Sequence, residues 1–496
     1  MSTTRKTVRT RFAPSPTGFM HIGNLRTALY EYLVARSLGG QFILRIEDTD
    51  QERYVEGAVE KIYETLAAVG LKHDEGPDVG GGYGPYVQSE RRGFYRPIAE
   101  KLVEEGKAYY CFCSQERLAH VHADQKNAAS GDTEQTFIGY DRHCRDLPQT
   151  ETDSRVAAGE PYVIRQRMPL TGETSFHDEV FGTITVQNST LEDQVLIKSD
   201  GFPTYNFANV ADDHAMAITH VVRGSEYLSS TPKYQLLYDA LGYEPPVYIH
   251  LPLILGSDGQ KLSKRHGATS FEELIEQGFL PEAVTNYLGL LGWSPSNDTR
   301  EMYTLEELEE AFTIEGIAKS PATFSIDKLT WFNGEYIRKL SAEEFLNYIR
   351  PVLDEVLPGL TEEQEALAAE ILQPRINRLP ELREQIIFMS EQPDYDTDIF
   401  VHKRSKSTVE SSARILSDLI PVYEQLEHWS REALHRIMID YAQANELKNG
   451  TVMWPVRIGV SGQTVTPGGA AEIMTLTGRD ESLARLKKAY ERLTNE

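Results

Sequence analysis

The chain is poor in cysteine and has no long apolar segment. Three cysteines among 496 residues are too few for a disulfide scaffold, so a reducing cytosol is the simplest compartment. No run of about eighteen apolar residues occurs, so we expect no membrane span. Met1–Thr10 is polar and basic and lacks the apolar core of a signal peptide. Together these absences predict a cytoplasmic protein.

Positive charge is also scarce. The sequence has 50 Lys and Arg against 75 Asp and Glu, which gives a formal net charge of −25. This balance argues against nonspecific binding of nucleic acid through bulk charge. It leaves room for a local basic patch, beside which an acidic remainder would repel RNA that is not correctly docked.

A chain of 496 residues is long for one core, so we expect several domains.

The segment 11–24 joins a strand-like run, Val8–Phe12, to a run with apolar residues at helical spacing, Leu25–Leu38. Its two prolines exclude regular structure and predict a tight turn. The turn delivers His21 and Gly23 to the start of a helix, where free backbone N–H groups favour a phosphate. The alternative is a proline-rich loop with a merely structural histidine.

A basic loop lies past the middle of the chain. Lys261–Arg265 reads Lys-Leu-Ser-Lys-Arg, and its three cations around a small hydroxyl residue suit a polyphosphate. Taken alone, such a run is most often a solvated surface loop. A third segment, Arg45–Asp50, ends a predicted strand. Because ligands bind beyond the carboxyl ends of parallel strands, Glu47 is placed at a site, and Asp48 or Asp50 at the cap of the next helix.

Strand and helix signals alternate in the first half of the chain. Phe42–Ile46 predicts a strand and Val55–Val69 a helix, which is the rhythm of a parallel sheet. After Cys111 the rhythm breaks, and later Ile218–Val222 predicts a strand with Arg223 at its carboxyl end. An arginine in that place is either a surface ion pair or a bidentate partner for a carboxylate.

The C-terminal half reads as helices and contains no catalytic constellation. The apolar spacing predicts helices at Glu343–Leu353, Thr361–Leu372, Pro380–Phe388, Val409–Leu426 and Arg431–Gln443. We expect the chain to end in a small mixed unit around Trp454–Gly462, followed by an amphipathic helix, Glu481–Leu493.

Taken together, the segment 11–24 and the basic loop resemble the two signature motifs of class I aminoacyl-tRNA synthetases, the HIGH and KMSKS sequences. The closer resemblance is to glutamyl-tRNA synthetases: Arg-Phe-Ala-Pro-Ser-Pro-Thr-Gly from Arg11, Arg-Ile-Glu-Asp-Thr-Asp from Arg45, and the Lys-Leu-Ser-Lys-Arg loop. It is dense from Arg11 to about Ile337. Asn24 replaces the last histidine of the class motif, which this family does not keep.

The resemblance implies an α/β fold in which a Rossmann-type parallel-sheet catalytic domain carries an inserted acceptor-binding domain. An all-helical half that contacts the tRNA stem and binds the anticodon would follow. The implied divisions are 1–110 and 198–270 for the two halves of the catalytic domain, 111–197 for the insertion, 271–340 for the stem-contact domain and 341–496 for the helical anticodon-binding domain.

The resemblance also implies the reaction: ATP-dependent attachment of L-glutamate to tRNA-Glu through a glutamyl-adenylate, with Mg²⁺ accompanying ATP. His21 and Lys264 are the expected catalytic residues, because in-line displacement needs compensation of charge on the α-phosphate. The ATP-binding set would be Pro14, Thr17, Gly18, His21, Gly23, Asn24, Lys261, Leu262, Ser263, Lys264 and Arg265. The glutamate-binding set would be Arg11, Ala13, Ser15, Glu47, Tyr205 and Arg223. Its buried cations would reject glutamine, since a neutral isostere leaves them unpaired.

All three cysteines lie in two short pieces of the chain. Thiolates from Cys111, Cys113 and Cys144 with a fourth ligand would suit a tetrahedral structural Zn²⁺. His143 is the obvious fourth ligand chemically but is adjacent to Cys144, whereas the resemblance points to Tyr140. The alternative is three reduced cysteines in a member that has lost the metal.

Three other functions fit parts of the pattern. A glutaminyl-tRNA synthetase is similar in architecture, but the basic loop and the helical C-terminal half speak against it. A nucleotidylyltransferase shares the His-x-Gly helix start. Such enzymes are usually a single nucleotide-binding domain, so this function would not explain the C-terminal half. A non-catalytic RNA-binding relic has no reason to keep His21 and the lysines. The sequence leaves open whether tRNA-Gln is also charged. Arg375 and Arg378 lie in a plausible region for anticodon contacts, and a monomer is the family expectation.

Overall fold

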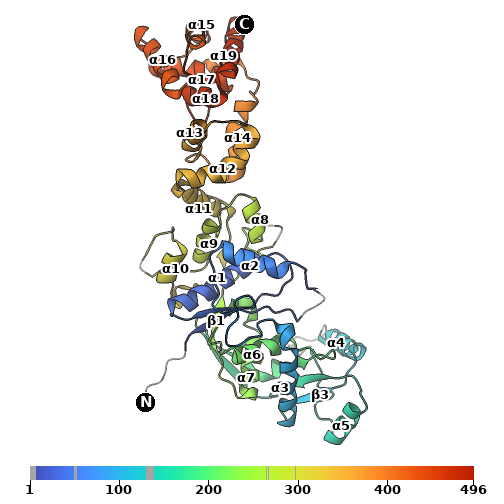
Figure 1. Ribbon diagram of the computed structural model, residues 1–496. Coiled ribbons are helices and arrows are strands. Elements are labelled where there is room, and N and C mark those ends of the chain that lie inside the picture. The colour runs from blue at the N-terminus through green and yellow to red at the C-terminus, as the bar shows by residue number, and fades with distance from the viewer. Residues whose placement is uncertain are drawn as a thin grey trace. The chain divides into compact units, whose positions relative to one another are not determined.

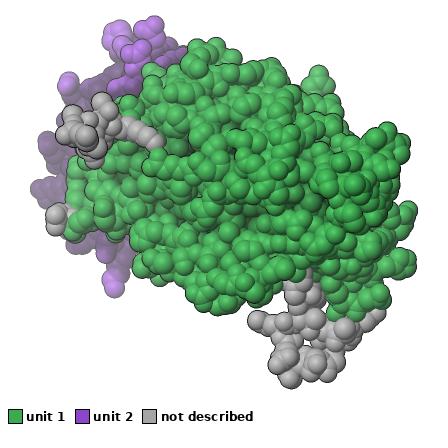
Figure 2. Space-filling view, turned by 90° about the horizontal axis from the view of Figure 1, so that it is seen from below, with its two compact units in different colours: residues 1–274, 284–325 green, residues 275–283, 326–496 purple. Residues whose placement is uncertain are grey.

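A computed structural model of the chain describes residues 7–49, 53–129, 139–263, 265, 267, 269–296 and 298–495. The chain divides into two compact units, which Figure 2 colours separately. The first unit comprises residues 1–274 and 284–325, and the second comprises residues 275–283 and 326–496. The five-part division expected from the sequence is finer than this and stays a prediction.

Parallel strands form the centre of the first unit (Figure 1). β1 (Arg9–Phe12) pairs in parallel with β2 (Gln41–Leu44), and α1 (Ile22–Ser37) connects them. β8 (His220–Gly224) pairs in parallel with β9 (Val247–Leu251), and α7 (Thr231–Leu241) connects them. The backbone N–H of Thr219 donates to the carbonyl of Arg9 at 3.0 Å, which joins the two pairs. The predicted parallel-sheet fold and its three strands are confirmed.

A second sheet lies in the segment between these two pairs. β3 (Ala108–Cys111), β4 (Val163–Gln166) and β7 (Val195–Ile197) form it with antiparallel pairing. The hairpin of β5 (Glu173–Asp178) and β6 (Gly182–Gln187) instead joins the sheet of β8 and β9, where Asp178 pairs with Tyr248. Every second residue of β5 is buried, as expected for a strand with one face on the core.

Helices cover the strands of the first unit. They are α2 (Ala58–Ala68), α3 (Arg92–Glu104), α4 (Gln115–Ala129), α5 (Gln149–Ala157), α6 (Tyr205–Ala215) and α10 (Leu305–Ala311). The chain passes between the units within α8 (Phe271–Glu276) and α9 (Pro281–Leu290). A short parallel pair, β10 (Ile254–Leu255) with β11 (Ala322–Thr323), completes this unit.

The predicted cap of α2 is wrong. This helix begins at Ala58, and its N-cap is Gly57, in the left-handed conformation with φ +80° and no side-chain hydrogen bond. Asp48 instead accepts the backbone N–H of Ser89 at 2.8 Å. A contact between residues so far apart in the chain decides its role, and local spacing does not reveal such a contact. Asp50 lies outside the described residues.

The second unit is built from helices. They are α11 (Ile326–Lys339), α12 (Ala342–Val356), α13 (Glu362–Leu372), α14 (Leu379–Ser390), α15 (Val409–Glu424), α16 (Arg431–Ala444), α17 (Asn449–Ser461), α18 (Ala470–Thr477) and α19 (Arg479–Asn495). Capping boxes start α12 at Ser341, α13 at Thr361 and α15 at Thr408, so three starts are fixed by local side chains. The predicted helices of this half are confirmed.

The predicted mixed unit around Trp454–Gly462 is wrong, because this stretch belongs to α17. Its β-branched residues and internal Pro455 favour an extended chain locally. In the structure Val452, Val456 and Val460 are fully buried among neighbouring helices. Burial on this scale outweighs weak local propensity.

None of the helices in the described part of the chain combines the length and apolarity that crossing a bilayer requires.

Candidate active site

A cavity of about 440 Å³ opens at the carboxyl ends of β1 and β8 in the first unit. Its walls include twelve of the residues predicted for the ATP and glutamate sites: Arg11, Ala13, Pro14, Ser15, Thr17, His21, Gly23, Asn24, Tyr205, Arg223, Lys261 and Leu262. Four others, Gly18, Glu47, Ser263 and Arg265, are not in its lining. Lys264 lies outside the described residues. Residues from both signature segments therefore share one cavity.

Backbone hydrogen bonds hold the two segments together. Ile22 donates to the carbonyl of Thr269 at 2.8 Å, and Phe271 donates to that of Met20 at 3.1 Å. On the other side of the basic loop, Leu262 donates to the carbonyl of Ile254 at 3.0 Å. The loop is thus fastened at both of its ends, and Lys261 lies on the wall of the cavity.

His21 is the N-cap of α1. Its Nδ1 accepts the backbone N–H of Gly23 at 3.0 Å. Burial and the nearby Lys261 lower the pKa of His21, so the ring is neutral near pH 7. Because Nδ1 is the acceptor, the single proton is on Nε2. That N–H has no role in the cap and can donate to a phosphoryl oxygen.

Arg223 carries an unfilled hydrogen-bond donor. The residue is 5 % exposed, and its Nη1 is buried without a hydrogen-bond partner. No ion pair to it occurs among the described residues, although its guanidinium lies 4.4 Å from the centre of the Tyr234 ring. A buried guanidinium on a cavity wall, with a free donor, is suited to a carboxylate. It is not the surface ion pair that the sequence left as the alternative.

Arg11 differs from Arg223 because it already has carboxylate partners. It pairs with Glu31 at 3.0 Å and with Asp213 at 3.1 Å. Arg45 pairs with the same Asp213 at 2.8 Å and with Glu47 at 2.9 Å. All five side chains are buried. Arg11 therefore offers a ligand less uncompensated charge than Arg223 does.

The pKa values of the carboxyl groups in this cluster are shifted in opposite directions. Burial raises the pKa of Glu31 well above its usual value, and Arg11 offsets only part of this. Burial also raises the pKa of Glu47, against the attraction of Arg45. Although burial acts on Asp213 in the same way, Arg11 and Arg45 together lower its pKa. Asp213 is thus the anion that both arginines share, and Glu47 keeps one buried oxygen, Oε2, without a partner.

Sequence reasoning missed several residues of the cavity wall, among them Glu31 and Glu226. A usable signal existed for Glu31, which is charged within the apolar run Leu29–Leu33. A buried charge of this kind is rare unless it is paired or functional. Glu226 gave no comparable signal.

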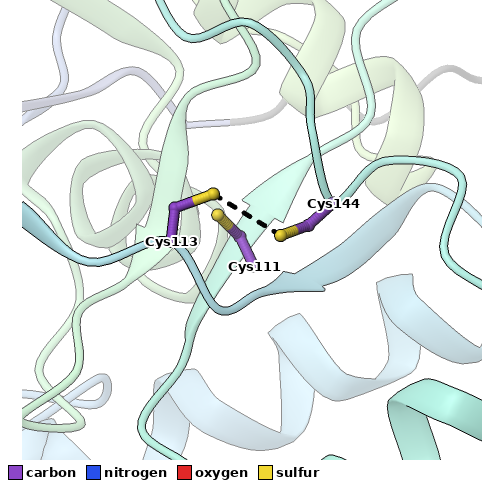
Figure 3. A group of neighbouring side chains, drawn as sticks. All are labelled: Cys111, Cys113 and Cys144. Carbon is purple, nitrogen blue, oxygen red and sulfur yellow. Dashed lines mark hydrogen bonds between the residues drawn. The ribbon is translucent and has the colours of Figure 1, made fainter. Parts of the chain in front are cut away.

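The three cysteines converge in the first unit (Figure 3). Their Sγ atoms all lie within 4.8 Å of one another, and those of Cys113 and Cys144 are 3.5 Å apart. Four thiolates around Zn²⁺ at about 2.3 Å would place neighbouring sulfurs about 3.8 Å apart, so the spacing fits a zinc site. A hydrogen bond from Cys144 lowers the pKa of Cys111 to about 4, which favours a thiolate.

The fourth position favours tyrosine over histidine. The Tyr140 hydroxyl lies 3.3 Å from Cys111 Sγ and 3.8 Å from Cys113 Sγ, and its side chain is buried. His143 is exposed, and its backbone N–H bonds to Asp141. The donor set that the residues bring together is therefore three sulfurs and one phenol oxygen.

The two arginines considered for anticodon contacts lie in the second unit. Arg375 is exposed, and Arg378 pairs with Glu381 at 3.4 Å. These positions assign neither of them a role.

Comparison with known proteins identifies the family of the chain and its fold. Residues 7–331 match the family of class I tRNA synthetases (E and Q), catalytic domain, and residues 331–490 match an anticodon-binding domain. The chain is 52 % identical to a glutamate–tRNA ligase of Clostridium botulinum over 486 residues, which are 98 % of each chain. It is 53 % identical to one of Lachnoclostridium phytofermentans over 491 residues, 98 % of this chain and 99 % of that one. A crystal structure of a glutamate tRNA ligase from Elizabethkingia meningosepticum, in complex with its amino acid, superposes with a TM-score of 0.88 at 36 % identity, covering 99 % of this chain and all of the other (100 %).

Proposed function

The chain belongs to the class I tRNA synthetases of the glutamate and glutamine group, and on that premise we propose that it attaches L-glutamate to tRNA-Glu. ATP and glutamate first give glutamyl-adenylate and pyrophosphate, and the terminal ribose hydroxyl of the tRNA then attacks the acyl carbon. The observation that carries this proposal is Arg223, a buried cation with a free donor on the wall that His21 and Lys261 also line.

The chemistry of the first step needs alignment and charge compensation. The substrate carboxylate is itself the nucleophile, so no Ser–His–Asp triad is required. We assign His21 to the α-phosphate, where its Nε2–H can bond to oxygens that gain charge in the transition state. Lys261 lies on the same wall and would hold the outer phosphates, with Lys264 as the second cation of the loop. Mg²⁺ is expected to enter with ATP.

Glutamate would be recognised by charge. Arg223 supplies the free guanidinium donors for a carboxylate, and Tyr205 lines the cavity beside it. Glu47 stays the expected partner of the α-ammonium because its Oε2 is buried and has no partner, although Glu47 is not in the cavity lining. Glutamine cannot satisfy the arginine, and an unpaired buried cation costs more than a neutral donor left unpaired.

We also propose that Cys111, Cys113, Cys144 and Tyr140 hold one structural Zn²⁺. The fit of sulfur spacing and buried phenol supports this assignment. Bound there, the metal would fasten β3 to the loop that carries Cys144, and so would stabilise the insertion rather than take part in catalysis. We expect the enzyme to act as a monomer.

Aminoacylation of purified tRNA-Glu and tRNA-Gln, each tested with glutamate and with glutamine, examines the proposal directly. We expect glutamate on tRNA-Glu and no product with glutamine. Glutamate on tRNA-Gln as well would identify the non-discriminating form. Glutamine on tRNA-Gln alone would identify a glutaminyl-tRNA synthetase and overturn the proposal.

A further inference from the structure

Two fully buried residues, one of which contacts Arg223, form a chain of polar contacts with it. Asp178, the last residue of β5, and His250, in β9, are both 0 % exposed. Asp178 Oδ2 lies 2.6 Å from His250 Nδ1 and also accepts the backbone N–H of His250 at 3.1 Å. The other ring nitrogen, Nε2, lies 3.3 Å from Arg223 Nε. An acid, an imidazole and a guanidinium thus form one line that ends at the cavity.

The chemistry of these groups fixes where the protons are. Asp178 Oδ1 accepts the N–H groups of Val180 and Phe181 at 3.0 and 2.8 Å, so this side chain acts as an acceptor throughout. Nδ1 of His250 must therefore carry the ring proton. Nε2 of the neutral ring then carries no proton, and its lone pair can accept a hydrogen bond from the Nε–H of Arg223.

Thr231 does not compete for that lone pair. Its hydroxyl lies 2.9 Å from the carbonyl of Tyr227, to which it donates its only proton. The hydroxyl oxygen accepts from Arg223 Nη2 at 3.5 Å, and toward His250 Nε2, at 3.3 Å, it has no proton left to donate. The single donor that faces His250 Nε2 is then the guanidinium.

Burial, together with the charge of Arg223, favours the neutral ring. Burial lowers the pKa of His250, the hydrogen bond to Asp178 raises it, and Arg223 lowers it, while Glu226 raises it more weakly; the pKa is lowered overall. A protonated ring would direct a second N–H at Arg223 Nε–H, and the two donors would repel each other.

We propose that Asp178 and His250 are positioning residues for glutamate recognition. Asp178 holds His250 in the Nδ1–H tautomer, and the Nε2 lone pair turns Arg223 so that its unpartnered Nη1 is available to the substrate carboxylate. This inference rests on the proposed function, because it assigns Arg223 to glutamate. It adds two residues that the cavity lining does not contain.

Two substitutions of His250 separate positioning from packing. In His250→Asn the side-chain amide nitrogen can take the place of Nδ1 and still donate to Asp178. No atom is then left to accept the Nε–H of Arg223. In His250→Gln the longer amide can place its carbonyl near the Nε2 position, so that Arg223 keeps an acceptor while Asp178 loses its side-chain donor. A purely structural role predicts that Asn is better tolerated, because it leaves no buried carboxylate short of a partner.

We expect the two variants to rank in opposite order for the KM for glutamate and for the melting temperature. The KM for glutamate should rise about tenfold or more in His250→Asn, and by less than about threefold in His250→Gln, with the KM for ATP unchanged in both. The melting temperature should fall more in His250→Gln. Equal KM values for glutamate, or a higher KM in His250→Gln, would overturn the inference.

A measurement on the unaltered protein covers the case in which neither variant folds. Neutron diffraction should show deuterium on His250 Nδ1 and none on Nε2, and deuterium on Nε2 would overturn the inference. If the wild-type protein failed to charge tRNA with glutamate, the proposed function would fall, whatever the neutron map showed.

Discussion

The backbone N–H of Ile22 donates to the carbonyl of Thr269 at 2.8 Å, although the two residues lie at opposite ends of the nucleotide-binding fold in sequence. This bond fastens the start of α1 to the chain that leaves the basic loop. It brings Lys261 near enough to lower the pKa of His21. The lowered pKa of His21 therefore depends first on burial and then on a lysine from the other segment.

Replacing His21 by asparagine should remove catalysis while keeping the helix cap. Asparagine can still accept the N–H of Gly23, but it is too short to donate where Nε2 does. We expect the rate of glutamate-dependent pyrophosphate exchange to fall by about 10²–10³-fold, with little change in melting temperature. The matched control is His177→Asn at an exposed position, which should leave the rate unchanged. A His21→Asn enzyme with near-normal exchange would remove the role assigned to His21.

Replacing Arg223 by glutamine should weaken glutamate activation selectively. The neutral amide cannot compensate the substrate carboxylate, so we expect kcat/KM for glutamate to fall by about a hundredfold or more. The KM for ATP should change by less than about threefold, because no phosphate is assigned to this residue. Steady-state exchange kinetics with each substrate varied in turn measure both values. Equal losses for the two substrates would contradict the assignment.

The buried cluster around Arg11 predicts unequal losses of stability for two isosteric changes. Asp213→Asn removes the anion that Arg11 and Arg45 share, which should cost about 3–5 kcal/mol of unfolding free energy. Glu31→Gln should cost less than about 1 kcal/mol, because burial already raises the pKa of Glu31 and favours its neutral form. Urea denaturation followed by circular dichroism compares the two. A larger loss for Glu31→Gln would refute this account of the charges.

The cysteine cluster predicts one Zn²⁺ per chain. Elemental analysis of protein purified without chelator should find about one equivalent of zinc, and Cys144→Ser should abolish it and lower the melting temperature. Tyr140→Phe should weaken zinc retention against a chelator, since the phenol oxygen is lost. His143→Ala is the control and should retain the metal, because His143 is exposed. Full zinc in Tyr140→Phe together with loss in His143→Ala would reverse the choice of fourth ligand.

Three histidines make stability depend on pH in the mildly acidic range. Burial lowers the pKa values of His21, His220 and His250 in the folded state. Below about pH 6.5 the unfolded chain therefore binds more protons than the folded chain, and stability falls as pH falls. Each fully unprotonated histidine contributes a slope of up to about 1.4 kcal/mol per pH unit. His220→Gln should flatten the decline of stability between pH 6.5 and 5, whereas the exposed His428→Gln should not. An unchanged slope in His220→Gln would contradict the prediction.

The fold was predictable where its signals are local. The helix starts at Ser341, Thr361 and Thr408 are marked by capping residues a few positions from their partners. The turn that delivers His21 follows from its prolines. By contrast, the strand-like residues of Val456–Val460 predict the wrong element, because only the surrounding helices make α17 favourable. Asp48 was misassigned for the same reason: its partner, Ser89, lies in another part of the fold.

The site divides in the same way. The residues proposed to bind ATP and glutamate were readable as motifs, because each motif is a short run whose geometry the backbone fixes. Whether a charge is free or already paired was not readable. Arg11 and Arg223 look alike in the sequence, but one has two carboxylate partners and the other has a bare donor.

The sequence by itself determined the family and the reaction, because its short motifs resemble those of known synthetases and a motif of this kind is a local run of residues. Only the tertiary structure showed that Arg11 is paired with two carboxylates whereas Arg223 keeps an unpartnered donor, and that His250 and Asp178 lie next to Arg223 on the side of β5 and β9. Those relations join strands far apart in the chain, and pairing across such distances is set by how the whole sheet assembles, not by any local pattern.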